Sequence, residues 1–357
     1  MSAFDIDRVL RPHMLDLEPY RSARHDFSDG VLLDANENPY GLAPAWAGNS
    51  LNRYPDPVQN ELCSRLADLN GVERDSVFVS ASSDEAIDLL LRLFCSPGRD
   101  AVAICEPTYG MYRVAAAVHD VRVLAVPLAD GFQLDVAAVA DRCAGDIPPK
   151  LIFCCSPNNP TGNLLDGGEI VRLCSAVDAV VVVDEAYIEF ADAESLARRV
   201  RGIPNLVVIR TLSKAWALAG VRIGYAIASP RLIGYLRKIK PPYNVGSLAA
   251  AVALETLADP GRMRRVIDEV AAERERVAGL LRGLRSIETV YPSNANFLLI
   301  KCAGATELQR RLAATGIIVR DRSMEPGLSG CLRITIGTPR ENDLLISALT
   351  AMEGMTP

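Results

Sequence analysis

The chain has 357 residues, more than one domain usually contains, so we expect two domains and a sizeable buried core. Hydrophobic residues make up 49% of the sequence, yet no run approaches the roughly 20 apolar residues of a membrane-spanning helix. The net charge of -6 and the pI near 5.3 disfavour nucleic acid or an anionic membrane as a partner.

The nine cysteines are scattered and several lie in apolar runs, which indicates reduced thiols in a cytoplasmic protein rather than a disulfide framework. The three histidines, His13, His25 and His119, have no metal-ligand spacing to one another or to a carboxylate. We therefore expect no metal site and no histidine-dependent triad. No signal peptide is expected, and no Walker P-loop or GxGxxG motif is present.

Residues 1 to about 29 are polar with scattered aromatic residues and are expected to form an N-terminal arm. The stretches 32–41 and 51–57 are rich in turn residues and are interpreted as loops, which often carry functional groups. Tyr54 lies in the second loop. On this context alone a packing role is the more common one for such a tyrosine.

A short strand at 77–79 is predicted to lead into a helix that begins near Ser82. Ser82 and Glu85 have the spacing of a capping box, and apolar residues then recur on one helical face. A helix N-terminus presents free N–H groups and the positive end of the helix dipole, which suits a phosphate. An ordinary capped helix has the same pattern, so this stretch alone leaves both interpretations open.

Short apolar runs then alternate with helical stretches, and we expect strands at 101–104, 121–126, 151–155, 180–183 and 206–209. Their apolar residues are continuous rather than alternating, which predicts an α/β fold whose mostly parallel sheet is covered by helices. Ligands of such sheets collect at the carboxyl ends of the strands. Asn159, Asp184 and Lys214 all come just after predicted strands.

Residues 248–284 are rich in Ala, Glu and Arg with helical periodicity, and further strands are expected at 296–300 and 332–336. Arg333 lies on the opposite face of the last strand from its apolar neighbours. Taken alone, such an arginine is more often an edge charge or an ion-pair partner. The predicted organisation is an N-terminal arm (1–29), a large domain (30–250) and a smaller C-terminal α/β domain (251–357).

The stretch from Thr211 to Gly224 places Lys214 among small and apolar residues, with Ser213 before it and Arg222 after it. Loss of hydration lowers the pKa of such a lysine and makes its neutral amine available as a nucleophile. Ser213 and Arg222 can bind an anion beside it. An amine next to an anion site suits pyridoxal phosphate, although a surface lysine after a strand is the plain alternative.

Other residues match the needs of the same cofactor. Its ring nitrogen must stay protonated, so a carboxylate is needed against it, and Asp184 at the end of a buried strand is placed for this. Asn159 and Tyr187 can donate hydrogen bonds to the ring oxygen. Tyr109 can stack on the ring face.

The ordered motifs NPTG (159–162), DEAYIEF (184–190) and RTLSKAWALAGVRIG (210–224) resemble those of the fold-type-I pyridoxal-phosphate aminotransferases. TYGMY, LNRYPD and GCLRITIGT are similar to the histidinol-phosphate branch of that family. The resemblance covers about residues 20–340. It implies a cytoplasmic homodimer of histidine biosynthesis that transfers an amino group between L-histidinol phosphate and 2-oxoglutarate. An aromatic amino-acid aminotransferase, a threonine-phosphate decarboxylase and a catalytically inactive relative are the alternatives.

The resemblance also implies a role for each matching residue. Lys214 binds the cofactor covalently and moves the substrate's proton, with Asp184 on the ring nitrogen and Tyr187 on the ring oxygen. The other cofactor contacts are Tyr109, Asn159, Ser82, Ser83, Ser213, Arg222 and, from the other subunit, Tyr54. The substrate's anionic end is assigned to Tyr20, Arg320 and Arg333.

Two positions depart from the family pattern. Ser82 stands where glycine is usual, and its side chain is expected to alter how the backbone approaches the phosphate. Trp216 stands where phenylalanine is usual and is expected to change packing only.

Overall fold

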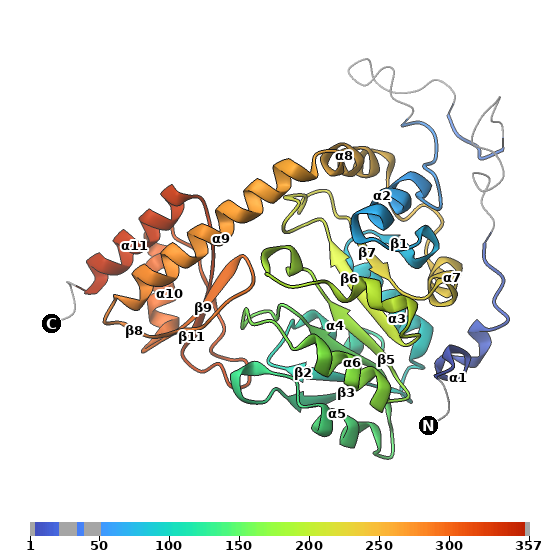
Figure 1. Ribbon diagram of the computed structural model, residues 1–357, viewed down its shortest axis with the longest axis horizontal. Coiled ribbons are helices and arrows are strands. Elements are labelled where there is room, and N and C mark those ends of the chain that lie inside the picture. Colours follow the sequence, from blue (N-terminus) through green and yellow to red (C-terminus); the bar gives the residue numbers. More distant parts are fainter. Residues whose placement is uncertain (1–3, 21–33, 39–50, 354–357) are drawn as a thin grey trace.

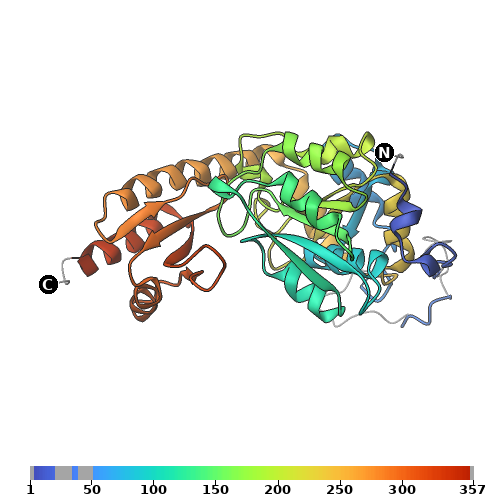
Figure 2. The same ribbon diagram turned by 90° about the horizontal axis from the view of Figure 1, so that it is seen from below.

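The computed structural model describes residues 4–20, 34–38 and 51–353. Within them, a seven-stranded sheet and a four-stranded sheet are flanked by helices in an elongated molecule (Figures 1 and 2). The long helix α9 (Pro260–Arg282) runs from beside the large sheet to the small one (Figure 1). In this described part of the chain, every helix is too short or too polar to cross a membrane.

The large sheet has the strand order β1-β7-β6-β5-β4-β2-β3. Its strands are β1 (Val77–Ser80), β2 (Ala101–Glu106), β3 (Arg122–Pro127), β4 (Pro149–Cys155), β5 (Val180–Asp184), β6 (Leu206–Thr211) and β7 (Gly224–Ile227). All run parallel except β7, which is antiparallel to both neighbours. The expected strands and the mostly parallel sheet are confirmed. β7 was not expected, because it begins with glycine and lacks the continuous run of branched apolar residues that marks the other strands.

Both faces of this sheet are buried. Val181 and Val183 of β5 belong to one apolar core, and Val180 and Val182 belong to the other, because successive side chains of a strand point to opposite faces. Helices α2 (Asn60–Asn70), α5 (Val136–Cys143) and α6 (Gly167–Ala176) contribute to the first core. Helices α1 (Ile6–Val9), α3 (Ser83–Phe94), α4 (Met111–Val118) and α7 (Pro230–Ile239) contribute to the second.

The small sheet is antiparallel, with the order β10-β11-β9-β8. Its strands are β8 (Ile287–Val290), β9 (Phe297–Cys302), β10 (Arg320–Asp321) and β11 (Cys331–Thr335). Helices α9, α10 (Ala305–Ala314) and α11 (Pro339–Glu353) share an apolar core with it. Leu332 and Ile334 lie in this core and Arg333 points away from it, as expected from the alternation along β11.

The helical stretch expected at 248–284 is confirmed as two helices, α8 (Ser247–Leu257) and α9. The N-terminal half of α9 places Met263 and Ile267 in a core of the large sheet, and its C-terminal half places Val277 and Leu281 in the core of the small one. Short 3-10 helices complete the described elements: η1 (Pro12–Met14), η4 (Arg74–Ser76), η5 (Asp130–Phe132), η6 (Ile188–Phe190) and η7 (Leu196–Arg201).

Candidate active site

A cavity of about 530 Å³ lies where the carboxyl ends of the parallel strands face the small sheet. Ten of the residues singled out from the sequence line it: Ser83, Tyr109, Asn159, Asp184, Tyr187, Ser213, Lys214, Arg222, Arg320 and Arg333. The sequence did not single out these further lining residues: Asp84, Gly110, Met111, Cys155, Ala186, Thr211 and Arg322. The structure thus brings together groups that are spread over most of the chain.

Lys214 sits in a turn that is fixed to the start of β7. Thr211 Oγ1 accepts a hydrogen bond from the Ser213 N–H at 3.1 Å and donates one to the Ile223 carbonyl at 3.3 Å. Burial lowers the pKa of the Lys214 amine, and the charges of Arg333 and Arg222 lower it further. A larger fraction of the amine is therefore neutral, which is the form that acts as a nucleophile.

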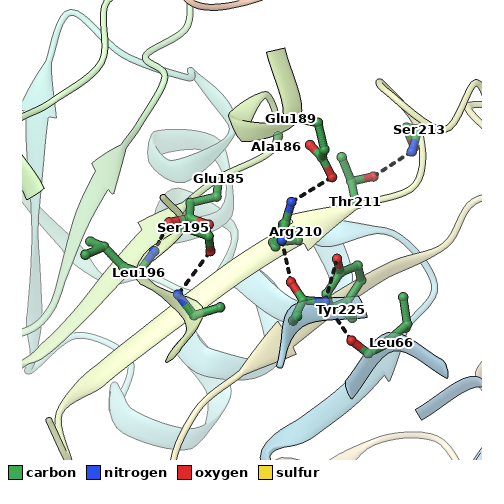
Figure 3. Close-up of polar contacts among 12 residues, drawn as sticks. Leu66, Glu185, Ala186, Glu189, Ser195, Leu196, Arg210, Thr211, Ser213 and Tyr225 are labelled. Atoms are coloured by element: carbon green, nitrogen blue, oxygen red, sulfur yellow. Dashed lines mark hydrogen bonds and ion pairs between the residues drawn. The ribbon is translucent and has the colours of Figure 1, made fainter. Parts of the chain in front are cut away.

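A buried polar network lies under this turn (Figure 3). The Arg210 guanidinium of β6 pairs with Glu189 at 2.8 Å and also donates to Asn70 of α2. Glu185 accepts hydrogen bonds from the Leu196 N–H at 2.8 Å and from the Ser195 hydroxyl. The Arg210–Glu189 pair ties the end of β6 to the segment after β5, and the Glu185 contacts tie that segment to the start of η7. Together they fix the two strand ends that carry the lysine and the aspartate.

The Asp184 carboxylate is buried, and both of its oxygens accept hydrogen bonds. The Ala186 N–H donates to Oδ1 at 3.1 Å and the Tyr112 hydroxyl donates to Oδ2 at 2.7 Å. Burial raises the pKa of Asp184 to about 6, and these two hydrogen bonds oppose the rise. Sequence reasoning missed Tyr112, the last residue of the TYGMY motif, because its contact with Asp184 joins residues 72 positions apart.

The turn before α3 forms one end of the cavity. Ser82 has φ 81° and ψ 164°, a conformation that glycine adopts far more readily than other residues. The expected capping box is wrong: the Ser82 side chain makes no capping bond, and Glu85 accepts instead from the Ala81 N–H. Ser82 itself is buried and does not line the cavity. The next residue, Ser83, does line it.

Asp84 and Arg222 face each other at this end. The Tyr109 hydroxyl donates to Asp84 Oδ1 at 3.2 Å, and Arg222 Nη2 lies 3.5 Å from Asp84 Oδ2. Together with the N-terminus of α3, Arg222 and Ser213 supply donors for a phosphate.

Three arginines from or beside the small sheet close the other end. Asn159 Oδ1 accepts from Arg333 Nη1 at 2.6 Å and from Arg322 Nη2 at 3.4 Å. Arg322 also pairs with Glu325 at 2.6 Å, and Arg320 lies directly across from Arg333 in the β10–β11 pairing. Sequence reasoning missed Arg322, and its only signal was its position two residues after Arg320. This end of the cavity suits an anionic group.

Tyr54 and Tyr20 do not line the cavity. The Tyr54 ring stacks on Tyr243, with centroids 4.3 Å apart, and remains 49% exposed. Tyr20 is 71% exposed. Only Tyr54 was expected from the other subunit. Tyr20 was expected beside Arg320 and Arg333, and the structure does not bring it to their cavity.

The donor set fits pyridoxal phosphate. A lysine amine of lowered pKa, a buried carboxylate held by two donors, and an arginine beside a helix N-terminus are its three main requirements. Metal ligation has no comparable support: in the part of the chain that the structure describes, no three His, Cys, Asp or Glu side chains could hold an ion. His119 does contact a carboxylate, Asp88, far from it in sequence.

Known proteins resemble this chain over nearly its whole length. The family described as aminotransferase class I and II matches residues 28–349. A histidinol-phosphate aminotransferase of Parabacteroides distasonis is 47% identical over 351 residues, which are 98% of this chain and 99% of that protein. The protein of the same name from Serratia proteamaculans is 41% identical over 98% of each chain.

Solved structures agree with the sequence relatives. The histidinol-phosphate aminotransferase of Sinorhizobium meliloti in complex with pyridoxal-5'-phosphate has a TM-score of 0.78 at 26% identity and covers 90% of each chain. L-threonine-O-3-phosphate decarboxylase of Porphyromonas gingivalis has a TM-score of 0.74 at 26% identity, over 87% of this chain and 93% of that one. Pyridoxal phosphate is the cofactor of the matched family. This chain belongs to the class I and II aminotransferases.

Proposed function

We propose that this chain is a pyridoxal-phosphate-dependent transaminase that moves the amino group between L-histidinol phosphate and 2-oxoglutarate, a step of histidine biosynthesis. The observation that carries the proposal is that one cavity joins the Lys214 amine to three arginines at its far end. Relatives with 39% to 47% identity, all named histidinol-phosphate aminotransferase, support this choice of substrate.

The cofactor, when bound, supplies a ring that accepts electrons from the substrate carbon. Lys214 would hold the cofactor covalently through Nζ; once the substrate's amine has displaced it, the freed Nζ would move the proton at the carbon that bears the amino group. Asp184 keeps the ring nitrogen protonated, and Tyr187 and Asn159 hold the ring oxygen. The remaining assignments follow the expectations from sequence: Tyr109 on the ring face; Ser83, Ser213, Arg222 and the partner's Tyr54 on the phosphate; Arg320 and Arg333 on the substrate. Ser82 and Tyr20 were expected to share these roles, but they lie outside the lining of the cavity.

Anion recognition at Arg333 explains how one pocket accepts two substrates. Histidinol phosphate has no carboxylate on the reacting carbon, so its phosphate takes that place, whereas glutamate brings carboxylates. A planar guanidinium binds either group through paired N–H bonds, and a lysine offers only a point charge. The two other arginines beside Arg333 strengthen the attraction for both anions.

The test measures each half-reaction separately by stopped flow in the unmodified enzyme and in Arg333→Lys. The variant should lose about 2–4 kcal/mol of transition-state binding in both halves, the range for a charged hydrogen-bonded contact. Arg310→Lys on the exposed face of α10 is the control and should change neither. If histidinol reacts as well as its phosphate, the proposed substrate is wrong.

An aromatic amino-acid aminotransferase and a threonine-phosphate decarboxylase are the alternatives, and the relatives' names do not favour them. The decarboxylase structure and the histidinol-phosphate aminotransferase structure are each 26% identical to this chain, so the solved structures do not separate the two activities. The sequence relative at 47% identity is named as the aminotransferase. Release of carbon dioxide from O-phosphothreonine without any keto acid would establish the decarboxylase instead.

We further propose a cytoplasmic homodimer whose subunits complete each other's sites. All nine cysteines are free thiols, as in reducing compartments. Tyr54 points to a neighbouring aromatic ring and not into the cavity of its own subunit. Nearby, α8 leaves Leu248 and Val252 49% and 41% exposed, an apolar surface that a second subunit would cover. The proposed division of each subunit is an arm (1–29), a large domain (30–250) and a small domain (251–357).

A further inference from the structure

Tyr112 is a fully buried tyrosine whose hydroxyl contacts Asp184 on the side away from the cavity. It lies in the first turn of α4 and does not line the cavity. Its ring stacks on Phe153 of β4, with centroids 4.7 Å apart and planes 11° apart, and meets the edge of the Tyr109 ring at 5.5 Å. Packing alone therefore fixes the ring, and a phenylalanine would fill the same space.

The hydroxyl has a more specific partner than packing requires. It donates to Asp184 Oδ2 at 2.7 Å, a short bond to a carboxylate that is itself buried. The Ala186 N–H holds the other oxygen at 3.1 Å. With one donor behind each oxygen, the carboxylate cannot rotate, and its remaining lone pairs are directed to the cavity that Asp184 lines.

We propose that Tyr112 is the positioning residue for Asp184: its hydroxyl keeps the buried carboxylate ionised and aimed at the cofactor's ring nitrogen. The proposal rests on the assignment of Asp184 to that nitrogen. Tyr112 itself does not touch the cofactor; it acts through Asp184 and makes protonation of the ring nitrogen favourable.

The surroundings of Asp184 show why this donor matters. Burial and the charge of Asp84 favour a protonated carboxyl, whereas the Lys214 charge and the two hydrogen bonds favour the carboxylate. Cys155, Tyr109 and Tyr187 also face it and are neutral, since the pKa of each is raised by burial. Without the Tyr112 hydroxyl the pKa of Asp184 rises further, and the charge that attracts the ring N–H is lost in part of the molecules.

The test compares two ligands in the full chain stripped of cofactor. One is pyridoxal phosphate and the other is its analogue with C–H in place of the ring nitrogen. Tyr112→Phe should weaken binding of pyridoxal phosphate about tenfold, the effect of one hydrogen bond to a charged group. Binding of the analogue should change less than about twofold, because it has no nitrogen for Asp184 to act on. Equal weakening of both ligands, or of neither, overturns the proposal.

A double-mutant cycle separates the path through Asp184 from any other. In the Asp184→Asn background, Tyr112→Phe should no longer alter the binding ratio of the two ligands. Tyr235→Phe is the matched control: it removes a hydroxyl that bonds to the Asp7 carboxylate at 3.0 Å, outside the cavity lining, and should leave both affinities unchanged. A persistent effect of Tyr112→Phe in the Asp184→Asn background contradicts the proposal.

A second variant tests the proposal even if Tyr112→Phe does not fold. Incorporation of 3-fluorotyrosine at position 112 keeps the ring and makes the hydroxyl a stronger donor, so the preference for pyridoxal phosphate over the analogue should be kept or increased. A decrease contradicts the proposal. The binding ratio is measured without any amino donor, so this test is independent of the proposed function. The role of Tyr112 can be contradicted while the protein still transaminates histidinol phosphate. The role of Tyr112 can also be supported while the protein does not.

Discussion

Ser82 stores strain at the residue scale, because its φ of 81° and ψ of 164° lie in a region that is almost reserved for glycine. Ser82→Gly should stabilise the protein by about 1 kcal/mol, since about 1–3 kcal/mol of strain is removed and part of it is offset by the extra freedom of glycine in the unfolded chain. The bond from the Ser80 hydroxyl to the residue 82 carbonyl stays in place.

Denaturant unfolding measures this change. Ser83→Gly is the control, because residue 83 begins α3 in ordinary helical conformation and glycine there should lower the free energy of unfolding. A Ser82→Gly protein that is less stable than the unmodified one would show that the turn is not strained.

Asp184 carries a cost to stability before the cofactor binds. Its pKa is about 6 in the folded chain against an ordinary value of 3.8, so between these pH values the unfolded chain ionises first and folding weakens as pH rises. Asp184→Asn should therefore stabilise the cofactor-free protein by roughly 3 kcal/mol above pH 6, because each unit of difference between the folded and unfolded pKa corresponds to about 1.4 kcal/mol.

The pH dependence identifies the cause. Below about pH 3 the carboxyl is protonated in both states, so the advantage of Asp184→Asn should disappear there. Unfolding curves of both cofactor-free proteins from about pH 3 to pH 8 give the comparison. An advantage that does not change with pH would mean that packing, and not ionisation, explains it.

The sequence predicted the site residues that directly follow strands. It missed the residues that contact them from distant parts of the chain. Lys214, Asp184 and Asn159 were expected at one sheet edge because parallel strands bring their carboxyl ends together. Tyr112 reaches Asp184 from a helix 72 residues away, and no local pattern records such a contact. Arg322 was missed for the same reason, since its partner Asn159 lies 163 residues earlier.

At the scale of elements, the short strand β7 joins the lysine turn to the phosphate end of the cavity. It lies between β1 and β6, and a Cβ on its first residue, Gly224, would stand 2.2 Å from the Ser83 backbone nitrogen. Glycine at 224 therefore lets β7 and the start of α3 approach closely. The sequence motif ends at this glycine, but its periodicity predicted neither the strand nor its antiparallel direction.

Gly224→Ala should move the Ser82–Ser83 turn, because the collision is with backbone and no side chain can yield. We expect cofactor affinity to fall at least about tenfold and the free energy of unfolding to fall by about 1–3 kcal/mol, the range for overpacking. Fluorescence titration and denaturant unfolding measure the two effects. Gly220→Ala in the same segment is the control, since its added Cβ meets no atom within 4 Å. Equal behaviour of the two variants would contradict the close-approach explanation.

At the scale of the whole molecule, the cavity needs both sheets. The large sheet contributes the lysine and the aspartate, and the small sheet contributes Arg320 and Arg333. α9 packs in the cores of both and so fixes their distance. Tyr54 lies outside the lining of this cavity, and its proposed place is the cavity of the other subunit.

Mixing two variants of low activity tests whether Tyr54 of one subunit completes the cavity of the other. Tyr54→Phe lacks the phosphate contact and Lys214→Ala lacks the nucleophile, so each dimer alone should have low activity when cofactor is limiting. If Tyr54 crosses the interface, a hybrid has one site with both residues intact. Random exchange makes about half of the dimers hybrids, so activity should rise to about a quarter of the unmodified level. If Tyr54 served its own subunit, every hybrid site would lack one of the two residues and mixing would give no gain.

Sedimentation that finds an active monomer would contradict the dimer itself.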